Sequence, residues 1–412
     1  MRSGLLTAVA LALVLGGLIF AARERGRGDL TKLKAQLGAK VAIPPPVVIQ
    51  FGGLEALVLQ RSPMAGGMVP EFVTATFLPG RGMNLLQLRA FLPQKGEVDL
   101  LASPKPEDAA KLMNGAALHD DGAGSLGLGG ALELPWGSRL GGVASGDGKN
   151  VMTTWQGHGL SVPVTMSRMG TSGMAVGGLL LTEAADTVES NVMPDGDSTK
   201  AVFQAGTFGG RWLSKTEVTM TALLSSHILE IKVVAKNTGT EAEPMGVGWS
   251  PRFAIVSGDR ANARLKLPSG ERVEVGADGR PTGKLLAVTD TSYDYTGRAG
   301  VALGSKALDA SFVHLKQSLL DNGPVVELRD QSSGYGLRLT ALTSAIKCIS
   351  VNSPADGSTV TINPRFNYDD PFGREWTKEQ DTGMMVLQPG ESAQWKVRLE
   401  IFSLDNGPVT HF

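Results

Sequence analysis

EFVTATFLPGRGMNLLQLRAF, residues 71–91, is the stretch that decides the predicted fold. Apolar side chains recur through Glu71–Leu78 and Met83–Phe91, and Pro79-Gly80-Arg81-Gly82 between them has the residues typical of a tight turn. The pattern predicts two antiparallel strands joined as a hairpin.

Short runs of the same kind recur along the chain, with turn residues such as Gln388-Pro389-Gly390 between them. The clearest are Val218–Thr221, Ile228–Ala235, Val325–Leu328, Tyr335–Leu342 and Trp395–Phe402. Within the folded domain only Pro106–Met113 predicts a helix. A content of 42% hydrophobic residues and 53 glycines suits a strand-rich protein with many turns. The sequence therefore predicts an all-β fold, a large antiparallel β-sandwich.

Gly4–Ala22 is a run of 19 residues without a charge. As a helix it is long enough for about one bilayer crossing, and it also stands where a signal peptide would stand. A transmembrane anchor in the inner membrane and a cleaved signal peptide both stay open. Either one places the rest of the chain outside the cytoplasm, so we expect a periplasmic protein, anchored or secreted, with the membrane as partner of the anchored form.

The domain boundaries follow from this composition. We assign residues 1–22 to the signal anchor or signal peptide, and residues 23–46 to a charged segment and a Pro-rich linker. The β-sandwich domain is expected over residues 47–405, and residues 406–412 form a tail.

Several functional classes are disfavoured by composition and spacing. The 39 basic and 40 acidic residues balance, which gives no electrostatic reason to expect nucleic acid. The five histidines show no helical pairing and there is one cysteine, Cys348, so no metal site and no cofactor is predicted. Cys348 lies in an apolar run and is expected to be a buried strand residue. GAGSLG, residues 122–127, fits G-x-G-x-x-G, but more glycines follow it and a loop is expected.

Two further segments contain residues suited to a sugar site. LPWGSRLGG, residues 134–142, contains Arg139, whose guanidinium can donate several hydrogen bonds to ring hydroxyls. WQGHGL, residues 155–160, contains His158, which can donate or accept at neutral pH. A histidine between glycines is also typical of a plain loop, so each signal alone is weak.

Taken together, six segments resemble the aldose 1-epimerase (galactose mutarotase-like) family, in order, over roughly residues 72–402. They are FLPGRGMNLLQL, LPWGSRLGG, GHGL, NTGTEAEPMGVGWSPRF, STVTINPRFNYDDPF and VLQPGESAQWKVRLEIF. The resemblance implies the galactose mutarotase-like supersandwich, with a sugar cleft on one face. It also implies interconversion of sugar anomers by a base and an acid on opposite sides of the sugar ring.

This sequence departs from the family pattern at both of those positions. The histidine of the family's His-Pro-Tyr-Phe corresponds to Ser250, and the glutamate of its Glu-Pro corresponds to Asn363. A serine hydroxyl is a very weak acid and an amide does not take up a proton, so neither residue can do this work. Asp369 and Asp370, six and seven residues beyond Asn363, are possible substitute bases, and His158 is a possible substitute acid.

The residues that the resemblance assigns to sugar binding are largely retained. These contacts are Arg139, His158 and Asp309 (in LDASF). Beyond the resemblance, Trp249 or Trp136 is available for stacking, and Arg252 suits either an anionic sugar or an ion pair within the sandwich. Three functions stay open: a carbohydrate-binding protein with lost or altered epimerase chemistry, an active aldose 1-epimerase with substitute residues, and a structural scaffold that uses the sandwich for protein contacts.

Overall fold

A computed structural model describes residues 48–61, 67–114, 122–164, 174–193, 196–318, 320–377 and 380–404. From Ile49 onward the chain forms one compact unit. The predicted anchor or signal segment, Gly4–Ala22, lies outside the described residues. Among the helices of the described ranges, none is long and apolar enough to cross a membrane.

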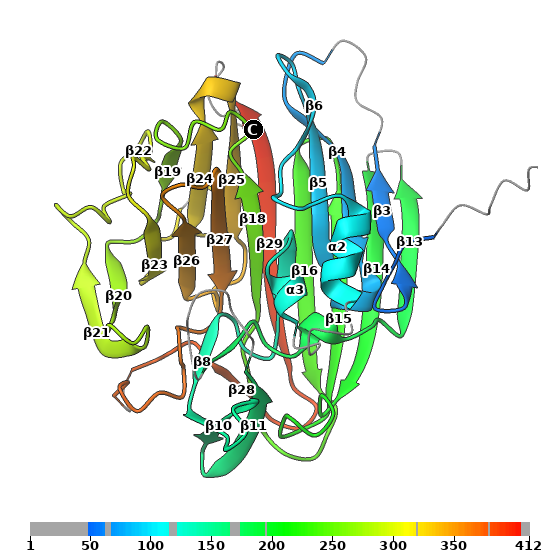
Figure 1. Ribbon diagram of the computed structural model, residues 1–412, viewed down its shortest axis with the longest axis vertical. Helices are drawn as coiled ribbons and strands as arrows, with labels where there is room; N and C mark the ends of the chain where they lie inside the picture. Colours follow the sequence, from blue (N-terminus) through cyan, green and yellow to red (C-terminus); the bar gives the residue numbers. More distant parts are fainter. Residues whose placement is uncertain are drawn as a thin grey trace, which may run out of the picture. The chain divides into compact units, whose positions relative to one another are not determined.

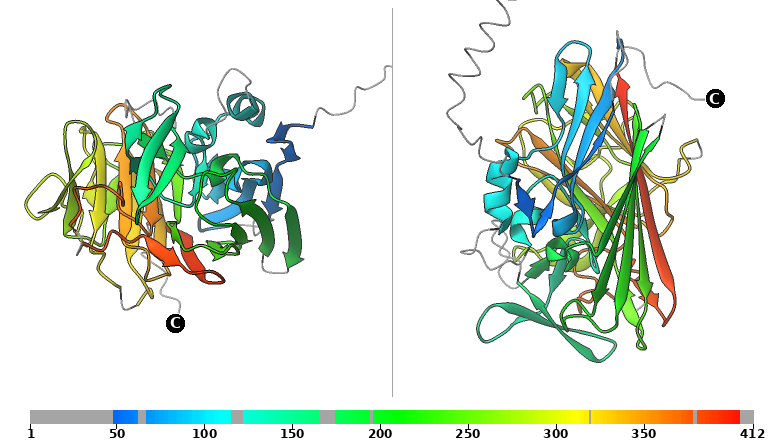
Figure 2. Two further views of the ribbon diagram at one scale, coloured as in Figure 1. Left: turned by 90° about the horizontal axis from the view of Figure 1, so that it is seen from below. Right: turned by 90° about the vertical axis from the view of Figure 1, so that its right-hand side faces the viewer.

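Two large antiparallel sheets make up this unit (Figures 1 and 2). The first has nine strands in the order β13 (Thr187–Met193), β14 (Gly196–Gly206), β15 (Thr216–Leu224), β16 (Ile228–Asn237), β29 (Ser392–Ser403), β25 (Tyr335–Ala341), β24 (Val325–Asp330), β19 (Arg264–Lys266) and β22 (Val301–Ala302). The predicted all-β antiparallel fold is confirmed.

The second sheet has eleven strands and carries most of the residues discussed below. Its order is β21 (Pro281–Ala287), β20 (Glu271–Val275), β23 (Leu308–Val313), β26 (Cys348–Ser353), β27 (Thr359–Arg365), β18 (Gly248–Ala254), β7 (Gly130–Glu133), β5 (Asn84–Leu92), β4 (Glu71–Leu78) and β3 (Leu57–Gln60), with β6 (Gly96–Asp99) paired to β5.

Small sheets and short helices complete the described chain. The sheets are β1 (Gln50–Phe51) with β2 (Leu54–Glu55), β8 (Arg139–Gly141) with β12 (Met174–Val176), β9 (Val143–Ala144) with β10 (Asn150–Trp155) and β11 (His158–Pro163), and β17 (Glu243–Met245) with β28 (Met385–Leu387). The helices are α2 (Pro106–Asn114), α3 (Ala123–Leu126) and the 3-10 turns η1 (Pro79–Arg81), η2 (Leu180–Thr182) and η3 (Gln331–Ser333).

The local predictions are confirmed with one exception. β4 and β5 form the predicted hairpin, closed by η1 and by Gly82 at φ 60°. The predicted helix is α2. Cys348 is fully buried in β26, and burial raises the pKa of its thiol to about 11. The loop expected at residues 122–127 is wrong, because Ala123–Leu126 completes one helical turn, α3.

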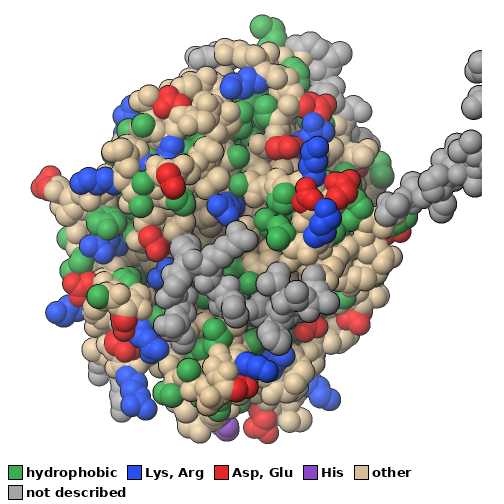
Figure 3. All heavy atoms as spheres, viewed as in Figure 1, with side chains coloured by type: hydrophobic (Ala, Val, Ile, Leu, Met, Phe, Trp, Pro, Cys, Tyr) green, Lys and Arg blue, Asp and Glu red, His purple; other side chains and the backbone are tan. Residues whose placement is uncertain are grey.

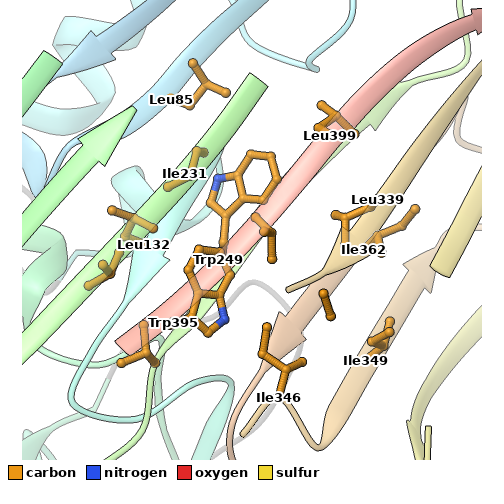
Figure 4. Close-up of a cluster of buried hydrophobic side chains, with 14 of the residues drawn as sticks. Leu85, Leu132, Ile231, Trp249, Leu339, Ile346, Ile349, Ile362, Trp395 and Leu399 are labelled. Atoms are coloured by element: carbon orange, nitrogen blue, oxygen red, sulfur yellow. The ribbon is translucent and has the colours of Figure 1, made fainter. Parts of the chain in front are cut away.

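The main core lies between the two large sheets (Figure 4). Trp249 of β18 packs edge-on against Phe253, with ring centroids 6.4 Å apart. Trp395 of β29 is fully buried, and its Nε1–H donates to the carbonyl of Pro364 in β27 at 3.3 Å. This hydrogen bond joins the nine-stranded sheet to the eleven-stranded sheet, so the two sheets are linked by polar as well as apolar contacts.

One buried carboxyl group in β17 lies in a costly environment. Glu243 is fully buried, and its Oε2 accepts a hydrogen bond from Thr216 Oγ1 at 2.9 Å. Its Oε1 has no hydrogen-bond partner among the described residues. Burial raises the pKa of Glu243 to about 7, because the core penalises the charged carboxylate.

We predict that Glu243→Gln changes the pH dependence of stability. The folded-state pKa of about 7 exceeds the ordinary 4.5, so the natural protein binds an extra proton when folded and loses stability as the pH rises from about 4.5 through 7. The Gln variant lacks this loss. The unfolding free energy of the variant minus that of the natural protein should therefore increase by up to about 3 kcal/mol between pH 4.5 and pH 8. Urea unfolding at both pH values checks this, and parallel pH profiles would contradict it.

Candidate functional site

One face of the eleven-stranded sheet collects polar side chains from far apart in the sequence. In β18 the side chains of Trp249 and Phe253 point into the core, so Gly248, Ser250 and Arg252 lie on the opposite, outer face. Residues paired directly across strands share a face. The register therefore identifies the neighbours of these three positions.

The register brings the predicted acid and base positions together. Ser250 is paired with Ala131 of β7. On its other side, the pairs Gly248–Arg365 and Arg252–Thr361 bring Ser250 level with Asn363 of β27. Asn363 is in turn paired with Ser350 of β26. Two neighbouring positions that could have carried an acid and a base therefore carry a hydroxyl and an amide.

The turn before Arg139 is fixed over this face by two buried carboxylates. Ser138 has a left-handed backbone at φ 57°. Its N–H donates to Glu133 Oε2 at 2.7 Å, and its Oγ donates to Asp369 Oδ1 at 2.7 Å. A left-handed serine costs conformational energy, and these two charge-assisted hydrogen bonds stabilise it.

Arg139 and Asp309 meet at the edge of the polar face. Arg139 Nη2 lies 3.1 Å from Asp309 Oδ2, in β23, and Nη1 donates to the carbonyl of Gly279 at 3.4 Å. The Arg139 side chain is 18% exposed and the Asp309 side chain is 54% exposed. The pair therefore offers both a donor and an accessible acceptor to a ligand.

Glu133 is the residue that the sequence analysis missed. It is buried at the end of β7, and its Oε2 also accepts from Asn363 Nδ2 at 2.8 Å. Burial raises the pKa of Glu133, although hydrogen bonds from Asn363 and Ser138 oppose this. A carboxylate thus remains next to the position of Asn363. The available signal was a single acid inside the apolar run GALELPW.

Asp369 is bound within the site by several partners. It forms an ion pair with the fully buried Arg365 at 3.1 Å and accepts a short hydrogen bond from Ser311 Oγ. Burial acts to raise the pKa of Asp369, but Arg365 and Arg139 outweigh burial and hold it below its usual range. Such a carboxylate is a weak base at neutral pH, which does not favour Asp369 as a substitute base.

Asp370 has the opposite electrostatic environment. It is buried at φ 46°, and its Oδ1 accepts from the Gly141 N–H at 2.9 Å. Its own N–H donates to the carbonyl of Arg139 at 2.7 Å. Burial raises the pKa of Asp370, which makes it the better proton acceptor of the two aspartates.

His158 lies at the turn of the β10–β11 hairpin, where it pairs with Trp155 (Figure 1). It is exposed, and its side chain forms no hydrogen bond or ion pair with any other described residue. The same hairpin borders a pocket of about 460 Å³, lined by Thr154, Trp155, Gln156, Pro371, Phe372, Gln380, Asp381, Thr382 and Met384. The structure therefore does not join His158 to the Arg139–Asp309 pair.

The two tryptophans predicted to stack on a sugar are both in the core. Trp249 is 1% exposed, and its Nε1–H donates to the carbonyl of Gly130 at 3.2 Å. Trp136 is fully buried and stacks on Trp212 with centroids 5.6 Å apart. Neither ring has a free face for a ligand, so a sugar-stacking role is contradicted for both.

Arg252 lies on the polar face, half-buried, and its Nη1 donates to the carbonyl of Gly127 at 3.3 Å.

Over the view of Figure 3, acidic and basic side chains are interspersed without a patch of one sign. In the described ranges, no cluster of three or more His, Cys, Asp or Glu side chains could hold a metal ion.

We predict that Glu133→Met loosens the turn that carries Arg139. Methionine has a similar volume but leaves the Ser138 N–H and the Asn363 amide without their acceptor. This should lower the unfolding free energy by about 2–5 kcal/mol. Hydrogen exchange at the Ser138 amide should also accelerate.

Glu133→Gln serves as the matched control, because its side-chain oxygen can still accept both hydrogen bonds. Chemical unfolding and hydrogen-exchange mass spectrometry of the peptide around Ser138 check the pair. Equal hydrogen exchange at Ser138 in the Met variant and in the natural protein would show that the hydrogen bond from the Ser138 N–H to Glu133 does not hold this turn.

The sequence model of the aldose 1-epimerase family matches residues 148–400. Several solved structures are similar in fold: a galactose mutarotase-like protein from Clostridium acetobutylicum (18% identity, TM-score 0.66, 84% of this chain and 99% of that chain), the GalM/aldose epimerase homologue from C. elegans (18%, 0.57, 80% and 95%) and galactose 1-epimerase from Lactobacillus acidophilus (13%, 0.56, 84% and 98%). No curated protein sequence matches. Because the family match spans more than half of the 412 residues, the chain belongs to the aldose 1-epimerase family.

Proposed function

We propose that this protein binds a carbohydrate through the polar face of the eleven-stranded sheet and has lost or altered the epimerase chemistry. The observation that carries the proposal is the cross-strand register that sets Ser250 of β18 directly level with Asn363 of β27. These two residues occupy the acid and base positions of the resemblance, and neither can exchange a proton at neutral pH. The Arg139–Asp309 pair, which suits hydroxyl binding, is retained.

The ligand is a neutral mono- or oligosaccharide, bound by hydrogen bonds to Arg139 and Asp309 rather than by stacking on an aromatic ring. A guanidinium donates several hydrogen bonds, and a half-exposed carboxylate accepts them from hydroxyl groups. Arg252, which forms no ion pair within the described part of the chain, favours an acidic sugar as the alternative ligand. Such convergent polar groups are typical of small-molecule sites.

A second candidate function is an active aldose 1-epimerase that uses substitute groups. Burial raises the pKa of both Asp370 and Glu133, which favours a carboxyl that exchanges protons near neutral pH. In this candidate one of these carboxyls acts as the base and His158 as the acid. Both carboxyls are bonded to backbone N–H groups, so this function ranks second.

The proposed location is outside the cytoplasm, with the chain anchored to the inner membrane or secreted. The uncharged run Gly4–Ala22 supports this proposal by its length and composition. A structural scaffold remains the third reading of the same fold.

We predict saturable binding of D-galactose or D-glucose to the full-length protein by isothermal titration calorimetry. Arg139→Lys and Asp309→Asn should each weaken the affinity about tenfold or more, because each removes part of a bonded pair in the site. Arg89→Lys is the matched control, since Arg89 pairs with Glu97 and Asp99 on β6 instead. Absence of binding by both sugars, or equal losses in the control, would remove the first proposal.

Polarimetry separates the two candidate functions. With fresh α-D-glucose, the first proposal expects a mutarotation rate equal to that of buffer. The second expects a rate above buffer that drops about 10²- to 10⁴-fold in Asp370→Asn, Glu133→Gln or His158→Ala.

For the location, we predict that alkaline phosphatase fused to the C-terminus is active in a bacterial host and that the fusion sediments with membranes or is secreted. Removal of residues 4–22 is the control and should abolish the phosphatase activity, because the enzyme needs an oxidising compartment for its disulfides. An active fusion without this run would contradict the proposed location.

A further inference from the structure

β13 is the outermost strand of the nine-stranded sheet and pairs on one side only, with β14 (Figure 1). All seven of its residues, Thr187–Met193, are exposed. They include Val188 at 38%, Met193 at 43% and Val192 at 88% exposure. An edge strand with three exposed apolar side chains, of which Val192 is almost fully accessible, is an open template for another strand.

The bare valines lie on the face of the sheet that elsewhere covers the core. Val188 is paired with Ala201 and Ser190 with Thr199, and both β14 residues are buried. The opposite sheet ends at β3, where the Gln60 N–H donates to Asp197 of β14 at 2.9 Å. Among the described residues the second sheet therefore stops one strand short, and none of its strands pairs beyond β3 to cover the inner face of β13.

β13 also lacks the features that keep sheet edges apart. It contains no lysine and no proline, and Glu189 is its one charged residue. Its pairing with β14 runs from Thr187 to Met193 without a register shift, so no bulge bends the edge away. Native edges that must stay single usually carry at least one of these features.

We propose that β13 pairs with β13 of a second copy of this chain, antiparallel, about a two-fold axis through Ser190. In this register Val188 lies opposite the partner's Val192, and Ser190 lies opposite the partner's Ser190. Both valine pairs fall on the uncovered inner face, so pairing buries the apolar surface that is bare in the single chain.

Charge and register support a second copy as the occupant. Glu189 lies opposite the partner's Asn191, so no like charges meet directly, and within its own sheet Glu189 lies opposite Lys200. A slip of one residue would place Val192 opposite Thr187 or Glu189 and would turn the valines of the two copies to opposite faces, which disfavours that register. A strand pair alone buries little surface, so we expect a dissociation constant in the micromolar range.

Ser190→Cys tests the two-fold axis directly. A residue on the axis meets its own copy at a Cα separation of about 4.5–5.5 Å, which a disulfide can span. We expect the full-length variant, in detergent solution, to form a covalent dimer under mild oxidation. The one native cysteine, Cys348, is buried and should not contribute. Thr187→Cys is the control on the same strand, because its copy would lie six residues away along the pair.

Sedimentation velocity tests the interface itself. The full-length protein should show a concentration-dependent dimer, and Val192→Lys should shift the dissociation constant upward by about tenfold or more, because it places a charge in the apolar pair. Val386→Lys, at a 41% exposed position on β28, should behave like the natural protein. Monomer at all concentrations, unchanged assembly of Val192→Lys, or equal cross-linking at positions 187 and 190 would each overturn the proposal.

Discussion

Ser138 lies between two buried carboxylates, and the geometry of the whole polar face depends on those contacts. Glu133 holds its backbone N–H and Asp369 holds its hydroxyl. The two carboxylates belong to segments more than two hundred residues apart, so the contacts also tie the turn to the strand β7 on one side and to the Tyr368–Asp370 segment on the other. Arg139 follows directly and can reach Asp309 because its neighbour is fixed.

The same contacts keep a carboxyl group beside Asn363, at the position that the family resemblance gives to a glutamate. The carboxylate of Glu133 lies beside Asn363, but it faces inward and bonds the protein's own donors. Arg365 is engaged in the same way: it forms an ion pair with Asp369 and donates hydrogen bonds to the hydroxyls of Ser311 and Ser350. The charges of this face are therefore largely engaged in holding its architecture, and few remain free for proton transfer.

Local patterns predicted the strands, the first hairpin and the helix α2, because alternation and turn residues act over a few positions. The family resemblance of LPWGSRLGG and of LDASF pointed to Arg139 and Asp309, two residues that the structure joins. The role of Glu133 could not be predicted from sequence, because one of its partners, Asn363, comes from the distant strand β27. The other partner is the backbone N–H of Ser138, in the turn after β7. The burial of Trp249 could have been predicted. Trp249 directly precedes Ser250 in one strand, and adjacent strand residues point to opposite faces, so a ligand that contacts Ser250 cannot also stack on Trp249.

The burial of Cys348 determines how its thiol reacts with oxidants. Its thiol is enclosed in β26 and stays protonated, since burial raises its pKa to about 11. A protonated, inaccessible sulfur reacts slowly with peroxides and with other thiols. The single cysteine of the folded molecule therefore remains a free thiol in reducing and in oxidising surroundings.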